Sequence, residues 1–385
     1  MKRINSIDVM RGIVMIIMAL DHTRDFLHFS SITQSPTDLG AATPAIFLTR
    51  WITHLCAPTF VFLSGTSAFI SLTNKGNSTE TRKFLLIRGI WLIVLDFTLI
   101  NFGLWFDIHF NVFLFDVLSA IGFGFIVLSF LLSASVRTIA VVGLGIVFLH
   151  NALPLLPLPE TMLKKILTAF FVPGAFSFGE GKLFVMGYPP IPWLGIVLTG
   201  FAAGSIFLSE QAIRRRIFLR IGLSAMVLSL IIRFINVYGD SFPWSDQKTG
   251  IYTFLSFINF TKYPPSLVFT LFFVGAMFLI LFVVEGMQNK FSAVTSVYGK
   301  VPLFYFVIHW YILHPIVFVV VFLQGYGFSD LLFGFNFGRP KGPSGLSLMG
   351  VYLIWIAVVA LLYPLCERFA RYKENHREKG LLRFI

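Results

Sequence analysis

The stretch PSLVFTLFFVGAMFLILFVVEGM, residues 265–287, decides the fold of this chain. It carries no charged residue between Leu267 and Val284. About 20 apolar residues are the length that a helix needs to cross roughly 30 Å of hydrocarbon, so the stretch predicts a membrane-spanning helix. Nine further runs have a similar character and lie at 8–28, 51–73, 84–106, 111–132, 138–156, 185–207, 217–237, 301–324 and 348–367.

The composition of the whole chain agrees with ten spans. Of the 385 residues, 56% are hydrophobic, 17% are aromatic and 12% are charged, whereas an ordinary globular protein is about 25% charged. This composition excludes a disordered chain, a disulfide scaffold and, despite a net charge of +12, a nucleic-acid-binding protein. We therefore expect an all-α, polytopic membrane helix bundle of about ten transmembrane helices.

We expect neither cleavage of a signal peptide at the N-terminus nor a disulfide between the two cysteines. Asp8, Arg11 and Asp21 interrupt the first apolar run, so we interpret it as a retained span and not as a cleaved signal peptide. Cys56 and Cys366 lie in apolar runs near opposite ends of the chain. They are expected to be small buried residues and not a disulfide or a metal site.

The distribution of basic residues predicts the orientation of the spans. With a cytoplasmic N-terminus, 20 of the 30 Lys and Arg residues fall in inner segments and seven in outer loops, as the positive-inside rule requires. An even number of spans then places both termini in the cytoplasm. The Arg214-Arg215-Arg216 run is accordingly a topology signal and a contact for anionic lipids.

The loops differ on the two sides of the membrane. Inner connections are short and basic, whereas the outer loops at 29–50, 157–184, 238–264 and 325–347 are long, and long irregular loops are a usual place for substrate recognition. No internal repeat is evident, which disfavours a repeat-built transporter. We expect one transmembrane domain over residues 1–367, followed by a basic cytoplasmic tail over 368–385.

Polar side chains are densest at the outer end of the first span, in DHTRDFLH at 21–28. Asp21, Arg24, Asp25 and His28 follow the i, i+3, i+4, i+7 spacing and are expected on one helix face. Asp25 would then orient His28 as a general base or a nucleophile, and Arg24 would neutralise Asp21. His22 is the competing histidine. The alternative is a solvated polar helix end that carries a surface ion pair.

Two other histidines are candidates because ionisable groups inside a span are costly. His309 has wholly apolar neighbours and must meet a polar partner inside the bundle, either as a functional group or as a structural one. His54 precedes Pro58 and a run of small residues, and a structural role for it is at least as well supported. No phosphate loop, dinucleotide fingerprint, zinc signature or nucleophile elbow appears, and we expect no metal.

The inner end of the first span carries Asp8 and Arg11 at an i, i+3 spacing. The two are expected to pair, or else Arg11 faces an anionic cofactor that enters from the cytosol. Arg11 and His28 are 17 residues apart, which is about 25 Å along a helix. This distance is close to the reach of extended coenzyme A. From the residues alone, an acyltransferase and a proton-coupled small-solute transporter are equally supported, and a non-catalytic envelope scaffold is a third option.

Five stretches carry a resemblance to a known family. They are RINSIDVMRG at 3–12, MALDHTRD at 18–25, YPPIPWLG at 188–195, TKYPPS at 261–266 and YGKVPLFY at 298–305, which runs into His309. Together they resemble bacterial membrane proteins related to the catalytic domain of heparan-alpha-glucosaminide N-acetyltransferase. The resemblance covers nearly the whole chain in order, and we expect no counterpart of the extra luminal domain of the lysosomal enzyme.

The resemblance implies a transmembrane acyltransferase in the bacterial cytoplasmic (inner) membrane. Acetyl-CoA, the acyl donor, would bind from the cytosol near Arg11 and Asp8, and the acceptor would be an extracytoplasmic glycan or small molecule. Position after the Arg-Gly motif favours His28 as the catalytic histidine over His22, with His309 or His54 steadying the oxyanion. Asp21, Arg24, His54, Lys262 and Tyr263 are the expected acceptor-binding residues. Partners are the lipid bilayer and the substrates, with a homodimer left open.

Overall fold

The computed structural model describes residues 4–76, 78–155, 161–376 and 378–383. Lys2, Arg3 and Arg377, which enter the charge argument above, lie outside these residues. Within them, eight helical segments are long and apolar enough to cross a membrane. They are Pro44–Asn74, Thr79–Trp105, Val136–Leu153, Pro190–Leu208, Gln211–Ile235, Leu267–Val284, Pro302–Leu323 and Leu348–Asn375.

Two further helices occupy the remaining positions at which spans are expected. Helix α1 (Asn5–Leu27) is long enough but carries several charged residues, and α6 (Val117–Leu131) is apolar but has only 15 residues, or about 22 Å. The prediction of an all-α polytopic bundle is confirmed. The chain is a multi-pass membrane protein.

In several predicted spans the α-helix is interrupted. The continuous apolar sequence of these spans did not predict the interruptions. The span at 51–73 consists of α2 (Pro44–Thr53) and α3 (Cys56–Lys75), and the next one passes from α4 (Ser78–Leu95) through a π-helical turn (Asp96–Ile100) into α5 (Asn101–Trp105). Helices α7 (Val136–Leu149) and α9 (Pro190–Ala202) each continue into a 3₁₀ turn. Four of the eight apolar segments are uninterrupted, like α1, and these are α10 (Gln211–Ile235), α12 (Leu267–Val284), α14 (Pro302–Leu323) and α15 (Leu348–Asn375).

A small three-stranded sheet occupies the start of two expected spans and part of the expected outer loop 157–184. Strand β1 (Val112–Phe115) pairs in parallel with β3 (Leu183–Met186), and β3 pairs antiparallel with β2 (Gly174–Ser177). The predictions that the spans at 111–132 and 185–207 begin as helices are therefore wrong at their first residues. Pro189 and Pro190 delay the start of α9, because proline fits the first turn of a helix but not its interior.

The outer loops contain short helices of their own. These are α8 (Met162–Ala169), α11 (Gly250–Ile258) and single 3₁₀ turns within 325–347. The C-terminal helix α15 continues past the expected span end at 367 to Asn375, so the first part of the expected tail is helical. A further 3₁₀ turn covers Gly380–Arg383.

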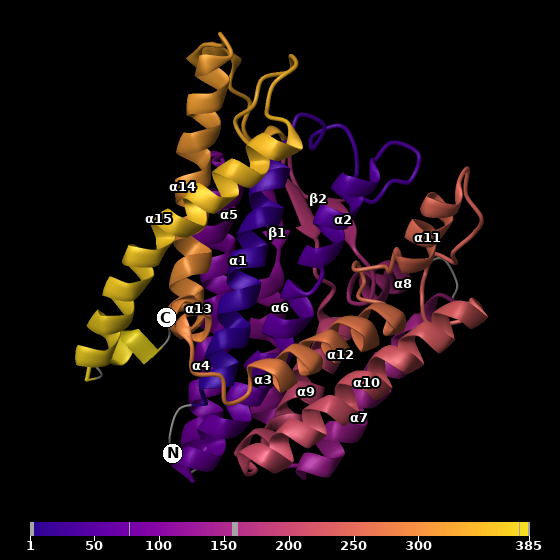
Figure 1. Ribbon diagram of the computed structural model, residues 1–385, viewed down its shortest axis with the longest axis vertical. Helices are drawn as coiled ribbons and strands as arrows, with labels where there is room; N and C mark the ends of the chain where they lie inside the picture. Colours follow the sequence, from indigo (N-terminus) through magenta and orange to yellow (C-terminus); the bar gives the residue numbers. More distant parts are fainter. Residues whose placement is uncertain (1–3, 77, 156–160, 377, 384–385) are drawn as a thin grey trace.

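Helix α1 runs through the middle of the bundle, with α14 and α15 on one side and α12 and α10 on the other (Figure 1). Its closest neighbour is α13 (Lys290–Lys300). A Cβ added to Gly12 would lie 1.8 Å from the Thr295 carbonyl oxygen, and one added to Gly299 would lie 1.7 Å from the Asp8 carbonyl oxygen. The two backbones touch through these glycines, as small residues allow in membrane bundles.

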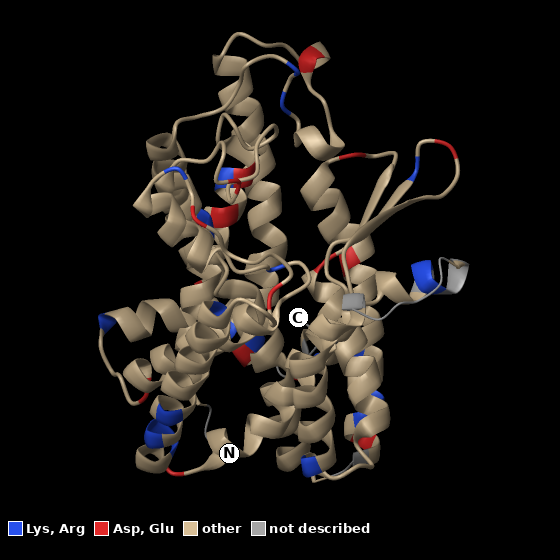
Figure 2. Ribbon diagram, turned by 90° about the vertical axis from the view of Figure 1, so that its right-hand side faces the viewer, with Lys and Arg blue, Asp and Glu red and all other residues tan. Residues whose placement is uncertain are grey.

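A buried polar link ties together three helices at the end of the bundle where α1 starts. Glu285, just after α12, accepts a hydrogen bond from Ser6 of α1 (2.6 Å) and pairs with Arg214 of α10 (2.5 Å). Several Lys and Arg positions lie at this lower end, and a smaller group of both signs lies inside the upper half (Figure 2).

Candidate functional site

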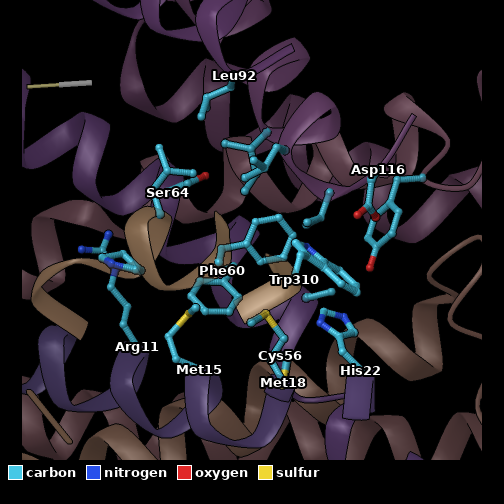
Figure 3. Close-up of a pocket in the computed structure, with 18 of the residues that line it drawn as sticks. Arg11, Met15, Met18, His22, Cys56, Phe60, Ser64, Leu92, Asp116 and Trp310 are labelled. Carbon is cyan, nitrogen blue, oxygen red and sulfur yellow. The ribbon is translucent and has the colours of Figure 1, made fainter. Parts of the chain in front are cut away.

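A cavity of about 770 Å³ follows α1 through the bundle. Six side chains of α1 line it, namely Arg11, Met15, Met18, Asp21, His22 and Asp25, of which Figure 3 labels Arg11, Met15, Met18 and His22. Helices α3, α4, α6 and α14 form the other walls. We call the end near Arg11 the inner end and the end near His22 the outer end, and the two are about 16 Å apart along α1.

The inner end of the cavity is basic. Arg11 donates hydrogen bonds to the Ser67 hydroxyl (2.5 Å) and to the Leu63 carbonyl (3.3 Å). Arg88, Lys300 and Lys373 line the same end, together with one carboxylate, Glu374, which lies 3.7 Å from Lys300. This cluster of guanidinium, ammonium and hydroxyl donors fits the phosphate groups of a nucleotide-bearing ligand.

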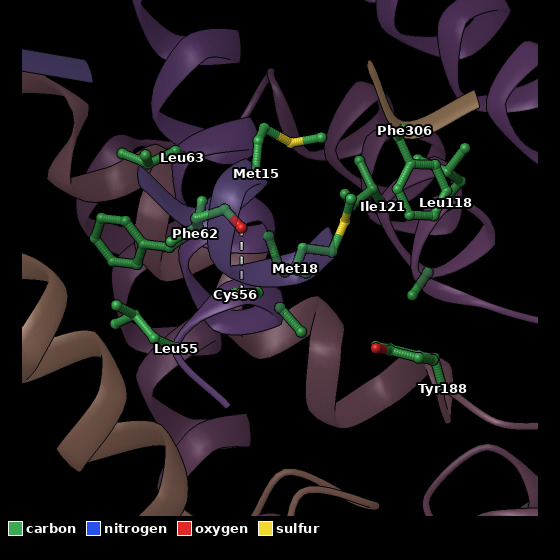
Figure 4. Packing of buried hydrophobic residues seen from close by; sticks show 14 of the residues in the cluster. Met15, Met18, Leu55, Cys56, Phe62, Leu63, Leu118, Ile121, Tyr188 and Phe306 are labelled. Carbon is green, nitrogen blue, oxygen red and sulfur yellow. Dashed lines mark hydrogen bonds between the residues drawn. The ribbon is translucent and has the colours of Figure 1, made fainter. Parts of the chain in front are cut away.

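The middle of the cavity is apolar. Met15, Met18, Phe60 and Leu92 line it, and the thiol of Cys56 is bonded to the Val14 carbonyl oxygen at 3.3 Å (Figure 4). Cys366 is buried elsewhere, and neither cysteine forms a disulfide. A wall of this kind suits the uncharged arm of a long ligand and keeps water away from it.

The outer end holds two histidines in contact. The His22 ring stacks on Trp310, with ring centroids 4.1 Å apart, and its Nδ1 lies 2.7 Å from Nε2 of His309. His309 Nδ1 in turn lies 3.3 Å from the Tyr305 carbonyl oxygen. The expectation that His309 meets a polar partner inside the bundle is met by His22.

These partners fix where the hydrogens lie. The Tyr305 carbonyl can only accept, so His309 Nδ1 carries a hydrogen and its Nε2 accepts one from His22 Nδ1. His22 Nε2 is thereby left with its lone pair, on a ring that lines the cavity. An imidazole held in this tautomer by its neighbour is ready to act as a general base.

The acidic residues of the outer end are tied to arginines. Asp21 accepts hydrogen bonds from Arg24 (2.9 Å) and from Arg50, and Arg24 also pairs with Asp25 (2.5 Å). The expected pairing of Arg24 with Asp21 is present. Asp21, Asp25 and Arg50 line the cavity beside His22.

His28 is placed differently from what helical spacing predicts. Helix α1 ends at Leu27 and His28 has an extended backbone, with ψ at 135°, so the i, i+3, i+4, i+7 pattern no longer directs its side chain. Its ring contacts the Ser30 hydroxyl (3.0 Å) and not Asp25. Its carbonyl accepts from Arg339 (2.8 Å) and Ser31 (2.8 Å), which holds the outer loop against the end of α1. The structure brings His22, and not His28, to the main cavity.

The remaining candidate residues divide between the cavity and the core. Lys262 and Tyr263 line the outer end, where the Tyr263 hydroxyl lies 3.3 Å from that of Tyr188. His54 is buried at the end of α2 against the edges of two phenylalanines, outside the residues that line the cavity. Asp8 is also buried outside the cavity.

Some residues that line the cavity were not among the candidates predicted from the sequence. Trp310 directly follows His309 and supplies the surface on which His22 stacks. Arg88, Lys300 and Lys373 are far apart in the chain, and only the tertiary fold gathers them at one end of the cavity. In the described part of the chain, no group of three His, Cys, Asp or Glu side chains is arranged to hold a metal ion.

The fold is a multi-pass bundle that encloses one long cavity, with a basic inner end and a histidine pair at the outer end. The family of the heparan-alpha-glucosaminide N-acetyltransferase catalytic region matches residues 3–239, which is more than half of the chain. The chain belongs to this family of transmembrane acetyltransferase-like proteins. The match ends after α10, so Lys262, His309 and Trp310 lie beyond the matched segment. No curated protein matches this sequence.

Proposed function

We propose that this protein transfers an acetyl group from cytosolic acetyl-CoA to an acceptor on the outer side of the bacterial cytoplasmic membrane. The acceptor is a sugar hydroxyl or amine. One observation carries the proposal. A single cavity connects a basic inner end to an imidazole with a free lone pair at the outer end.

The inner end supplies the donor site. Arg11, Arg88, Lys300 and Lys373 hold the phosphates of the donor through charge-assisted hydrogen bonds. The uncharged arm of the donor then lies along the apolar middle of the cavity, and its thioester reaches the outer end. Exclusion of water from this middle section protects the thioester from hydrolysis.

The outer end supplies the chemistry. His22 Nε2 accepts the proton of the acceptor hydroxyl or amine as that atom attacks the thioester carbonyl carbon. The resulting imidazolium keeps its Nδ1 hydrogen bond to His309 and lies beside the carboxylate of Asp21. His309 is a positioning residue, because both of its ring nitrogens are already bonded.

The proposal is tested with purified protein in liposomes and radiolabelled acetyl-CoA. His22→Ala is expected to lower the rate of acetyl transfer by about 10²- to 10⁴-fold, the range for loss of a general base. His28→Ala is the matched control, since it removes the same side chain six positions away, and should keep most of the activity. Loss of activity in the His28 variant with a fully active His22 variant would reverse the assignment.

A transporter remains the competing function. It predicts a proton-coupled solute flux that persists without coenzyme A and stops in the His22 variant. Absence of both acetyl-CoA binding and acetyl transfer in the wild-type protein, together with such a flux, would replace the acyltransferase proposal.

A further inference from the structure

Lys262 is a buried cation without a bonding partner. It lies in the loop between α11 and α12, is 8% exposed and lines the outer end of the cavity. Among the described residues its ammonium forms no hydrogen bond and no ion pair. Its one close interaction is with the Tyr263 ring, whose centroid is 4.9 Å from Nζ.

The other buried cations of the outer half are bonded. Arg24 and Arg50 share the Asp21 carboxylate. Arg233 donates to four backbone carbonyls, and Arg339 donates to three carbonyls and two hydroxyls. A buried charge without a partner costs several kcal/mol. A fold that keeps Lys262 in this state therefore leaves its donors for something that enters the cavity.

The surroundings of Lys262 point to the kind of group it meets. The ammonium acts electrostatically on His22 and on three carboxylates that line the cavity, namely Asp21, Asp25 and Asp116. Asp21 and Asp25 are paired with arginines, and among the described residues no carboxylate, Asp116 included, lies within ion-pair distance of Lys262, so none of them is the missing acceptor. The reacting carbonyl must sit within reach of His22 Nε2, and its oxygen gains negative charge during acyl transfer.

We propose that Lys262 is a catalytic residue that donates a hydrogen bond to the thioester carbonyl oxygen as it becomes negative. This assignment rests on the proposed acyl transfer. The acceptor heteroatom forms a bond to the carbonyl carbon, the C=O electron pair moves to oxygen beside Lys262, and His22 takes the acceptor proton. The pair then returns to re-form C=O, the carbon–sulfur bond breaks, and the coenzyme A thiolate leaves with the proton from His22.

This role differs from acceptor binding in a way that can be measured with any nucleophile. An acceptor-binding lysine matters only for the natural acceptor, whereas a lysine on the carbonyl oxygen also speeds attack by water or hydroxylamine. The assay follows the release of free coenzyme A thiol from acetyl-CoA, with water or hydroxylamine as acceptor, for protein reconstituted in liposomes. Acetyl-CoA affinity is measured in parallel.

Lys262→Met removes the charge and keeps the length of the side chain. We expect thiol release to fall about 10²- to 10³-fold, as for loss of an oxyanion donor, with the Kd for acetyl-CoA and the melting temperature within about twofold and a few degrees of wild type. Lys262→Arg should recover part of the rate. Lys248→Met is the matched control, because Lys248 belongs to the same outer segment, 238–264, lies just before α11 and does not line the cavity. It should leave the rate unchanged.

Three results would overturn the assignment. Unchanged thiol release in a folded Lys262→Met protein would leave Lys262 outside the reaction. A loss of acetyl-CoA affinity that accounts for the whole loss of rate would make it a donor-binding residue. If the wild-type protein neither binds nor cleaves acetyl-CoA, the proposed function is wrong and the Lys262 assignment fails with it. If the wild type is active and the variant is equally active, only the Lys262 assignment is wrong.

Discussion

The two ends of the cavity carry similar charges in opposite settings. At the inner end the ion pair of Lys300 and Glu374 joins side chains that are 34% and 46% exposed, and Arg11 and Arg88 are half-buried. At the outer end Asp21 and Arg24 are 7% and 2% exposed and are bonded to each other. Exposed charges exchange partners at little cost, whereas buried ones hold a fixed geometry. The inner end is therefore suited to bind and release a ligand, and the outer end to keep reacting groups in place.

The largest effect that tests this comparison is expected at Asp21. Asp21→Asn keeps the shape of the side chain but leaves Arg50 without its carboxylate and Arg24 with Asp25 alone, and it should lower the free energy of unfolding by about 3–5 kcal/mol. Thermal unfolding in detergent measures this. Asp38→Asn, an exposed change in the next outer loop, is the control and should be neutral. Equal stability of both variants would contradict a structural role for the outer charges.

A smaller effect, on binding and not on stability, is expected at Arg11. Arg11→Gln should weaken acetyl-CoA binding by about 10- to 100-fold, because a hydrogen bond to a charged group contributes about 1.5–3 kcal/mol. Titration calorimetry at two salt concentrations measures the loss and its salt dependence. Arg216→Gln removes an exposed arginine of α10 that does not line the cavity, and it should bind as wild type does. A pair of variants with the same affinity would refute a donor site at the inner end.

The smallest effect is expected at Lys300. Its ion pair with Glu374 is partly exposed, so Lys300→Gln should change the free energy of unfolding by less than about 1 kcal/mol. Lys300→Gln should also weaken acetyl-CoA binding measurably, because it removes a positive charge from the proposed phosphate site. Glu374→Gln should not weaken binding, because it removes a negative charge from the same site. A large loss of stability in either variant would erase the contrast between the two ends.

Much of the fold follows from the sequence because hydrocarbon thickness sets the length of an apolar run. All ten predicted positions contain a helix, and α14 at Pro302–Leu323 matches the expected 301–324 almost to the residue. The strands at Val112–Phe115 and Leu183–Met186 were not predicted, since they lie in apolar runs that continue directly into helices. An apolar run alone does not distinguish a strand from the first turns of a helix.

The candidate site was predictable only as far as local periodicity holds. The spacing of Asp21 and Arg24 gave their ion pair correctly, because both lie within α1. The same reasoning fails at His28, since the helix ends one residue earlier and Arg339 captures its carbonyl from a distant loop. The contact of His22 with His309 joins residues that are 287 positions apart, which no local pattern encodes.

The close contact of α1 with α13 has a consequence for the choice of donor. Glycine-to-carbonyl packing at Gly12 prevents α1 from sliding along its neighbour, and the helix is unbroken from Arg11 to His22. The distance between the proposed donor site at Arg11 and the proposed general base His22 is then set by helix rise alone, at about 16 Å. Under the proposed function, this fixed spacing selects donors by the length of the chain between their phosphates and their thioester. A donor with a shorter chain would be held at the inner end with its acyl group out of reach of His22.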